Sequence, residues 1–395
     1  MVDKIKLLSQ DIFTELVKIR RHLHSHPELS FKEYETSAYI KSLLDHYDIP
    51  YTDGWVETGI VAQVQGRSDG NKVIALRADI DALPITEENE VSYISVNQGI
   101  MHACGHDVHT TSLFGACIIL NQLKDDWGGI VKFIFQPGEE KLPGGAKLMI
   151  DHGVLDDPRP YCIFGQHVHP PLEVGKVGIR AGQYMASADE IYINISGKGG
   201  HAALPQELVD PVLIASHVIV ALQQLVSRKS NPFIPSVLSF GKINSIGGAT
   251  NIIPNKVTIE GTFRTMDEEW RDRAHTLIEK LATELAHSMG GVADVNIIKG
   301  YPYLKNDELL TNITKKKMIE YMGAENVVEL PKRMSAEDFA YYTHHIPGCF
   351  YRLGTGNKSK GITSSVHTPT FDIDEDALKV GAGLMAFLAI SALKD

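Results

Sequence analysis

The sequence contains few cysteines and no surplus of positive charge. Only four cysteines are spread over 395 residues, which excludes the disulfide framework of a small secreted domain. Asp and Glu number 49 against 38 Lys and Arg, so the formal net charge is −11. Because no run of Lys and Arg is present either, we expect neither nucleic acid nor an anionic membrane surface as a partner.

Long apolar runs are also missing. No stretch approaches the roughly 18 uncharged apolar residues that a membrane-spanning helix needs, and the N-terminus shows no apolar leader. We therefore expect neither secretion nor a membrane span, and we expect a reducing cytoplasm that leaves the cysteines free. A composition of 43% hydrophobic and 22% charged residues is typical of a globular protein, and the length suffices for two or three domains.

Residues 101–109 concentrate potential metal ligands. They include Cys104 and His106 on either side of a glycine, so both side chains can face one point if the chain turns there. An apolar run at 108–123 predicts a helix directly after them, and its N-terminus favours an anionic thiolate. Thiol and imidazole groups at this spacing predict a transition-metal site. The alternative is a buried cysteine among surface histidines.

Short apolar segments alternate with helical patterns in the first half of the chain. Segments 73–76, 130–135 and 161–164 predict strands. Residues 5–23 predict an opening helix, and Ser30 with Glu33 forms a possible capping box for a second helix. This alternation predicts an α/β fold with a mixed, largely parallel sheet covered by helices.

Each of the three predicted strands runs into polar residues, at 79–81, 136–140 and 165–169. In open α/β sheets, sites form beyond the carboxyl ends of the strands, so we expect these segments and the 101–109 loop to meet in one crevice. Glu139 and Glu140 are adjacent there, so one can bind a cation while the other takes a proton from water. The alternative is an exposed acidic turn. His167 and His169 can both face the crevice.

A second pattern begins after about residue 182. Alternating apolar and polar residues at 191–196 and 257–264, with helical patterns at 208–227 and 267–287, predict a separate α+β domain. We place this inserted domain at 184–298 and the catalytic domain at 1–183 and 299–395. The tail predicts helices at 307–321 and 335–342, a strand at 349–353 and a closing helix from 374.

Several motifs stand in a fixed order along the chain: His102-Ala103-Cys104-Gly105-His106-Asp107, Gln136-Pro137-Gly138-Glu139-Glu140, Gly197-Lys198-Gly199-Gly200-His201-Ala202, Asn251-Ile252-Ile253-Pro254, Gly261-Thr262-Phe263-Arg264 and Glu337-Asp338-Phe339. Together they resemble the amidohydrolase branch of the aminoacylase and carboxypeptidase-type dinuclear metallohydrolases. That branch includes hippurate hydrolases, N-acetyldiaminopimelate deacetylases and indole-acetyl-amino-acid hydrolases. The similarity covers nearly the whole chain.

The resemblance implies two divalent metal ions per subunit and an inserted lid domain that forms a homodimer. Matched residue by residue, it implies five metal ligands, namely Cys104, His106, Glu140, His167 and His367. Glu139 resembles the family's general base, and His201 resembles a histidine that crosses the dimer to polarise the scissile carbonyl. Asn251 and Arg264 are similar to a pair that holds the substrate's carboxylate. Thiolate and imidazole favour zinc, and relatives also accept manganese, cobalt or nickel.

We therefore expect hydrolysis of the amide bond of small N-acyl amino acids. The acyl group stays open, because Lys141-Leu142-Pro143 replaces a glycine-rich run and His169 stands where many relatives have Trp. A metal-dependent dipeptidase or carboxypeptidase of the same fold is the alternative. Two further alternatives are a hydrolase with Cys104 as nucleophile and a non-catalytic scaffold protein. Sensitivity to chelators and to thiol alkylation separates the first of these from a metalloenzyme.

Overall fold

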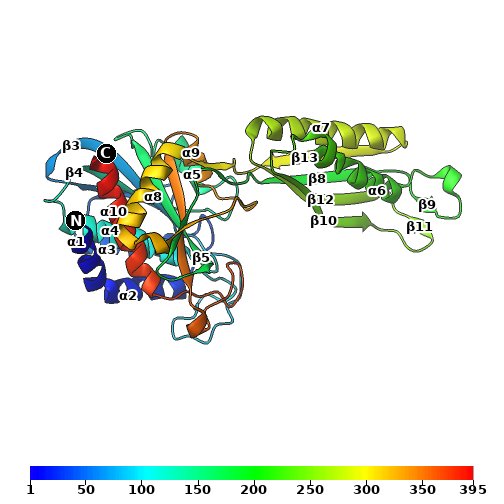
Figure 1. Ribbon diagram of the computed structural model, residues 1–395. Coiled ribbons are helices and arrows are strands. Elements are labelled where there is room, and N and C mark those ends of the chain that lie inside the picture. Colours follow the sequence, from blue (N-terminus) through cyan, green and yellow to red (C-terminus); the bar gives the residue numbers. More distant parts are fainter. Residues whose placement is uncertain (395) are drawn as a thin grey trace. The chain divides into compact units, whose positions relative to one another are not determined.

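The computed structural model describes residues 1–394 and divides the chain into two compact units (Figure 1). Unit 1 comprises Met1–Tyr184, Lys305–Pro331 and the residues from Asp338 onward. Unit 2 comprises Met185–Leu304 and Lys332–Glu337. The sequence predicts an inserted domain at 184–298. The insert of the structure ends later, at Leu304, and unit 2 also includes a short segment of the tail.

Unit 1 is built on an eight-stranded mixed sheet with the order β1-β2-β4-β3-β5-β16-β6-β15. The central strands β4, β3, β5 and β16 run parallel to one another. On one side β1 pairs antiparallel with β2 and β2 with β4, and on the other side β6 pairs antiparallel with β16. The predicted largely parallel sheet is confirmed. The strands are β1 Tyr51–Trp55, β2 Gly59–Gln65, β3 Ser68–Asp79, β4 Gly128–Gln136, β5 Cys162–Glu173, β6 Val177–Ile179, β15 Val327–Glu329 and β16 Gly348–Gly356. Strands β7 (Gly182–Met185) and β14 (Leu304–Asn306) form a separate two-stranded sheet.

Helices cover both faces of this sheet. Adjacent residues of a strand point to opposite faces, and Leu76 packs in the main apolar core with α4 and α10. Its neighbour Arg77 lies instead against Phe339, which precedes α9. The helices of unit 1 are α1 Val2–Asp11, α2 Phe13–Ser25, α3 Tyr34–His46, α4 His106–Gln122, α5 Gly145–Asp151, α8 Glu308–Met322, α9 Ala340–Thr343 and α10 Asp376–Lys394, with short 3-10 turns at Ala324–Asn326 and Lys358–Lys360.

Three local predictions need correction. The opening helix is two helices, α1 and α2, because the chain turns at Ile12. The predicted helix at 335–342 is only the four-residue α9, and 332–337 belongs to unit 2. Strand β5 continues to Glu173, so His167 lies within the strand rather than at its end.

Unit 2 is an antiparallel four-stranded sheet, β10-β12-β8-β13, with α6 and α7 side by side on one face (Figure 1). Ile191, Ile193 and Ile195 of β8 are buried against these helices in a second apolar core, as their alternation predicts. The elements are β8 Asp189–Ser196, β9 Gly200–His201, η1 Pro205–Glu207, α6 Pro211–Leu222, η2 Leu225–Lys229, β10 Ser236–Ile246, β11 Ile252–Ile253, β12 Lys256–Thr265, α7 Glu268–Ser288 and β13 Val292–Lys299.

Two helical segments are long and apolar enough to cross a membrane by length and composition, Pro211–Lys229 and Asp376–Lys394. Neither segment is among those expected from the sequence to span a membrane. The second is α10, and 72% of its most apolar window is buried inside unit 1. A buried core helix has the same composition as a membrane span, so these two segments are weak evidence for a membrane.

Candidate metal centre

The 101–109 loop turns at Gly105, as the spacing of its ligands requires. Gly105 caps the N-terminus of α4 in the left-handed conformation, with φ +80°. A Cβ there would lie 2.7 Å from the side chain of Val168, so a larger residue does not fit. The turn places Cys104 and His106 on the same side, and both side chains are buried.

The structure brings the five predicted ligands together. The Cys104 sulfur lies 3.4 Å from Nε2 of His167 and 3.3 Å from Nε2 of His367. Nε2 of His367 is also 3.2 Å from Glu140 Oε1. Ligand atoms of Cys104, His106 and His167 lie within 4.8 Å of one another, as do those of Cys104, Glu140 and His367. Two groups of donors thus share the cysteine.

The histidine rings are oriented by hydrogen bonds to their other nitrogen. Nδ1 of His106 lies 3.1 Å from Asp81 Oδ1, and Nδ1 of His167 lies 2.8 Å from the Val168 carbonyl oxygen. Both Nδ1 atoms therefore act as donors, which leaves Nε2 as the acceptor nitrogen of each imidazole in its neutral form. Nε2 of His106 is buried and has no hydrogen-bond partner. An acceptor nitrogen of this kind beside a thiol and carboxylates fits a divalent transition metal.

Asp79 and His109 form a further pair that sequence analysis missed. Nδ1 of His109 is 2.6 Å from Asp79 Oδ1, and its Nε2 accepts the Val168 N–H at 2.9 Å. Asp79 also forms an ion pair with Arg77 at 2.7 Å. Its carboxylate lies within possible ligand distance of His106 and His109. Burial alone would raise the pKa of Asp79. The nearby charges of His106 and Arg77 outweigh burial and hold this pKa well below its usual value. His109 stands in the ligand-rich stretch, and its α-helical spacing of three from His106 was the available signal.

The charges of the centre bear on the choice between metal ligand and nucleophile for Cys104. Burial, and then the nearby Glu140 carboxylate, raise the pKa of the Cys104 thiol. This direction is opposite to the one expected from the helix N-terminus. A nucleophilic cysteine needs a lowered pKa, so the thiol is not activated for attack. A cation between Cys104 and its neighbours is the interaction that stabilises a thiolate there.

His367 has an unusual backbone conformation. Its φ is +63°, a region that residues other than glycine rarely adopt. Its backbone N–H donates to the Ala103 carbonyl oxygen at 2.7 Å, next to Cys104. Strained backbone that is held by such contacts is common at functional sites. The side chain is about half exposed, at 53%, whereas the other four ligands are largely or fully buried.

The predicted capping box is wrong, because both of its side chains serve the centre instead. Ser30 Oγ donates to Asp81 Oδ2 at 2.6 Å, and the Glu140 N–H donates to the same oxygen at 3.0 Å. Glu33 accepts the Gly138 N–H at 2.9 Å and makes no capping bond to α3. Ser30 and Glu33 therefore support the loop that carries the two glutamates.

Glu139, the predicted general base, is buried and lies next to the ligands. An oxygen of its carboxylate, a ring nitrogen of His106 and a carboxylate oxygen of Glu140 lie within 4.8 Å of one another. Its Oε1 accepts the Asp338 N–H at 3.4 Å. Asp338 is held in turn by Arg77 at 2.6 Å. A buried carboxylate beside metal ligands is placed to accept a proton from water.

His201 and Asn251 come together within unit 2. Their short strands β9 and β11 pair with His201 opposite Ile252, and the Ala202 N–H donates to the Asn251 carbonyl oxygen at 3.0 Å. Nδ1 of His201 accepts the Ala203 N–H at 3.1 Å, so the ring proton lies on Nε2. The exposed His201 side chain is thus a ready hydrogen-bond donor.

Arg264 does not join them in the same chain. Asn251 precedes β12, which begins at Lys256, whereas Arg264 lies eight residues further along this strand. Eight residues of extended strand span roughly 26 Å. The Arg264 guanidinium donates to the Met334 carbonyl oxygen at 3.2 Å. The predicted pair for a substrate carboxylate is therefore not assembled by a single chain.

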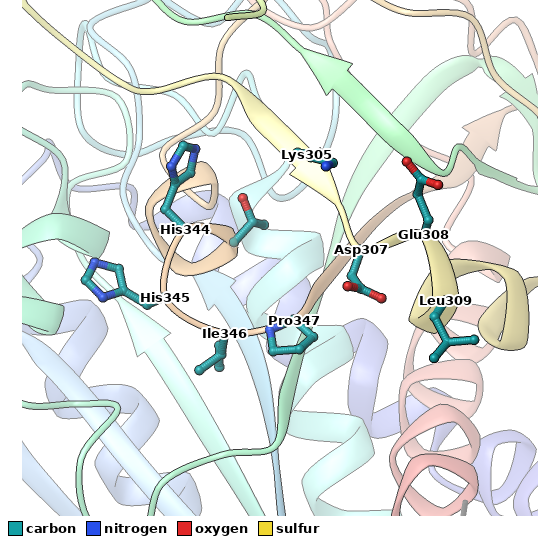
Figure 2. Close-up of a pocket in the computed structure, with 9 residues that line it drawn as sticks. Lys305, Asp307, Glu308, Leu309, His344, His345, Ile346 and Pro347 are labelled. Atoms are coloured by element: carbon teal, nitrogen blue, oxygen red, sulfur yellow. The ribbon is translucent and has the colours of Figure 1, made fainter. Parts of the chain in front are cut away.

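A pocket of ≈ 600 Å³ lies elsewhere in unit 1. Figure 2 shows its lining at Pro347, directly before β16. Since β16 runs parallel to β5, which carries His167, the pocket lies at the opposite edge of the sheet from the ligands. Its own histidines and carboxylates do not group within ligand distance among the described residues. It is lined by Lys305, Asp307, Glu308, Leu309, Thr343, His344, His345, Ile346 and Pro347.

Comparison with known proteins places this centre in a family. Residues 75–391 match the model of peptidase family M20/M25/M40. The chain is 42% identical over 365 residues to N-acetyl-L-cysteine deacetylase of Bacillus subtilis (strain 168), covering 92% of this chain and 85% of that protein. It is 40% identical over 383 residues to IAA-amino acid hydrolase ILR1-like 4 of Arabidopsis thaliana, covering 96% and 86%.

Solved structures agree with this assignment. The crystal structure of the Bacillus subtilis YXEP protein, a dinuclear metal binding peptidase, matches with a TM-score of 0.82 and 36% identity over 98% of this chain and 99% of that one. The family model covers most of the chain, and the relatives match it nearly from end to end. The resemblance seen in the motifs is confirmed: the chain belongs to peptidase family M20/M25/M40 and is a metal-dependent hydrolase of amide bonds.

Proposed function

We propose that the chain hydrolyses N-acyl amino acids to a carboxylic acid and a free amino acid. One observation carries the proposal: the donors of five residues converge beside the buried carboxylate of Glu139. The names of the relatives, an N-acetylcysteine deacetylase and a hydrolase of IAA-amino acids, support amides of amino acids as substrates. We propose Cys104, His106, Glu140, His167 and His367 as the ligands of two divalent ions.

The donor set supports zinc as the resident metal, with manganese, cobalt or nickel as alternatives. When bound, such ions lower the pKa of water from about 15.7 to near 7 and polarise a carbonyl oxygen. All four cysteines are free and buried. Free thiols support a reducing cytoplasm as the place of action.

The chain's own residues then divide the work. Glu139 takes a proton from the attacking water and returns it to the leaving amine. The Nε2–H of His201 donates a hydrogen bond to the carbonyl oxygen, where negative charge develops, and keeps its proton. Asn251 and Arg264 bind the carboxylate of the amino acid, and Arg264 supplies a planar fork of donors. Holding the carboxylate fixes the amide relative to the water and Glu139.

These roles call for a homodimer, because one chain does not bring Asn251 and Arg264 together. Unit 2 offers a surface for a second copy. Val220 on α6 is 72% exposed, and Ile243 and Ile246 are exposed on β10, the edge strand of its sheet. An unpaired edge strand beside an apolar helix face is suited to association with another copy. In the dimer, His201 and Asn251 act on the partner's substrate.

A dipeptidase or carboxypeptidase is the second candidate, since the chain is 36% identical to thermostable carboxypeptidase 2 of Saccharolobus solfataricus. The test is a panel of N-acetyl, N-benzoyl and indole-acetyl amino acids beside dipeptides with a free amine. Protein reconstituted with zinc or manganese is assayed for released amino acid. We expect turnover of the N-acyl amino acids. Efficient cleavage of the dipeptides alone would overturn the proposal in favour of the peptidase.

A further inference from the structure

Arg20 of α2 is completely buried and contacts two segments that carry proposed ligands. Its Nε donates to Asp107 Oδ2 at 2.8 Å, and its Nη2 donates to Asp372 Oδ1 at 2.7 Å. Asp107 directly follows His106, and Asp372 lies five residues after His367. One guanidinium thus joins the start of α4 to the chain that follows the last ligand.

We propose that Arg20 is a positioning residue for the metal centre. Its two hydrogen bonds set the distance between the 101–109 loop and the 367–372 segment. This proposal rests on the ligand set given above, since its consequence is the approach of Cys104 to His367. The two segments also meet where the His367 N–H donates to the Ala103 carbonyl oxygen. In this position His367 has a strained backbone with a positive φ. A conformation of that kind persists only where surrounding contacts hold it.

The neighbours of Arg20 extend the same connection. His24, one turn along α2, lies between two carboxylates, with Nδ1 at 2.8 Å from Asp107 and Nε2 at 3.1 Å from Glu87. Tyr93 donates to the second oxygen of Asp372 at 2.8 Å, and its ring lies under the Arg20 guanidinium at 5.0 Å. Asp372 therefore has both oxygens engaged. The connection is largely buried and is made by charged groups from four separate parts of the chain, α2, Glu87, Asp107 and Asp372.

Arginine is the residue type that this geometry requires. Its planar fork presents donors in two directions at once, whereas a lysine ammonium is a single point on a flexible stem. We expect Lys at position 20 to hold the two carboxylates less well than Arg, because its ammonium lacks the fixed pair of donors that Nε and Nη2 supply. The adjacent Arg21 is the control, because it is 43% exposed and donates its hydrogen bonds to Glu375 and not to Asp107 or Asp372. Like Arg20, it lies over the Tyr93 ring, at 4.7 Å.

The experiment compares R20K with R21K, each as the full chain reconstituted with Co²⁺. Affinity is measured by competition with a chromophoric chelator, and Cys104 is followed by the thiolate-to-cobalt charge-transfer band. We expect R20K to lose about 10- to 100-fold in affinity, the range typical of residues that support metal ligands, and to weaken the band. R21K should match the wild type in both. An equal loss in R21K, or an unchanged affinity in R20K, overturns the proposal.

A second variant covers the case in which R20K does not fold. D372N keeps the shape of the side chain but removes the charge that Arg20 binds, and Asp372 is only partly buried, with its side chain 19% exposed. We expect a roughly 10-fold loss of Co²⁺ affinity with the same weakening of the band. Wild-type affinity in folded D372N overturns the proposal. Absence of the thiolate band in the wild type itself shows instead that the ligand set, and with it the proposed function, is wrong.

Discussion

The two units hold their functional side chains in opposite ways. In unit 1, Cys104, His106 and His167 are buried, and neighbouring side chains or backbone groups fix both imidazole rings. In unit 2, His201 and Asn251 are exposed, and Arg264 lies at the far end of the same strand region. The chain alone completes the first set of residues and leaves the second set incomplete.

This difference indicates where each set obtains its precision. Buried donors need contacts within the chain, because an unsatisfied polar group in the interior is costly. Exposed donors carry no such cost, so their geometry can be set by a second copy or by the substrate. Variants in unit 1 should therefore act through proton transfer or metal binding in each subunit separately. Variants in unit 2 should act between subunits or on substrate binding.

Replacing the proposed base should have the largest effect. In E139Q the proton acceptor is lost, so we expect turnover to fall by up to about 10⁴-fold. Metal content per subunit, measured by atomic spectroscopy, should stay near that of the wild type. The adjacent E140Q is the matched control, and there we expect loss of metal as well as activity. Substantial turnover by metal-loaded E139Q would show that Glu139 is not the base.

Removing the exposed histidine should have the next largest effect and should be rescued between subunits. H201A is expected to lose about 10²- to 10³-fold in kcat, as for other oxyanion donors. When H201A and E139Q are unfolded together and refolded as an equal mixture, half of the dimers are mixed. Each mixed dimer has one complete site if His201 acts across the interface, so about a quarter of wild-type activity should return. A mixture as inactive as its components would place His201 and Glu139 in the same subunit's site.

The motifs predicted the fold and the ligand segments because their signals are local. Alternating apolar segments specify the sheet, and Cys104 and His106 flank a glycine that must turn. The approach of His367 could not be derived from spacing, since it lies 263 residues from Cys104 in sequence. Only the family resemblance pointed to it.

The supporting residues escaped prediction for a physical reason. Arg20 looks like an ordinary surface charge in the sequence, and only the fold buries it against Asp107. Ser30 and Glu33 have the spacing of a capping box, but their side chains bond Asp81 and Gly138 instead. A local pattern cannot reveal that a distant group competes for the same hydrogen-bonding atoms.

Burial in unit 1 should also make stability depend on pH through Glu33. Burial, followed by the Asp81 carboxylate, raises the pKa of Glu33 from its usual 4.5 to about 7. The unfolded chain then releases this proton at lower pH than the folded chain. The contribution of Glu33 should lower the free energy of unfolding by about 3 kcal/mol as the pH rises from 4.5 to 7. Above pH 7 this contribution should no longer change with pH. Urea unfolding of metal-free wild type and E33Q measures it: the difference between the two should change across that window, and a constant difference would contradict the shift.

The smallest expected effect concerns Arg264 and tests whether unit 2 acts on the substrate. In R264A a charged fork is lost, so KM for an N-acyl amino acid should rise by about 30-fold, which corresponds to about 2 kcal/mol. The matching N-acyl amino acid amide lacks the carboxylate, so its KM should hardly change. R273A, at an exposed arginine on α7, is the control and should leave both values unaltered. If R264A weakened both substrates equally, Arg264 would support the structure of unit 2 through its bond to Met334 rather than recognise the carboxylate.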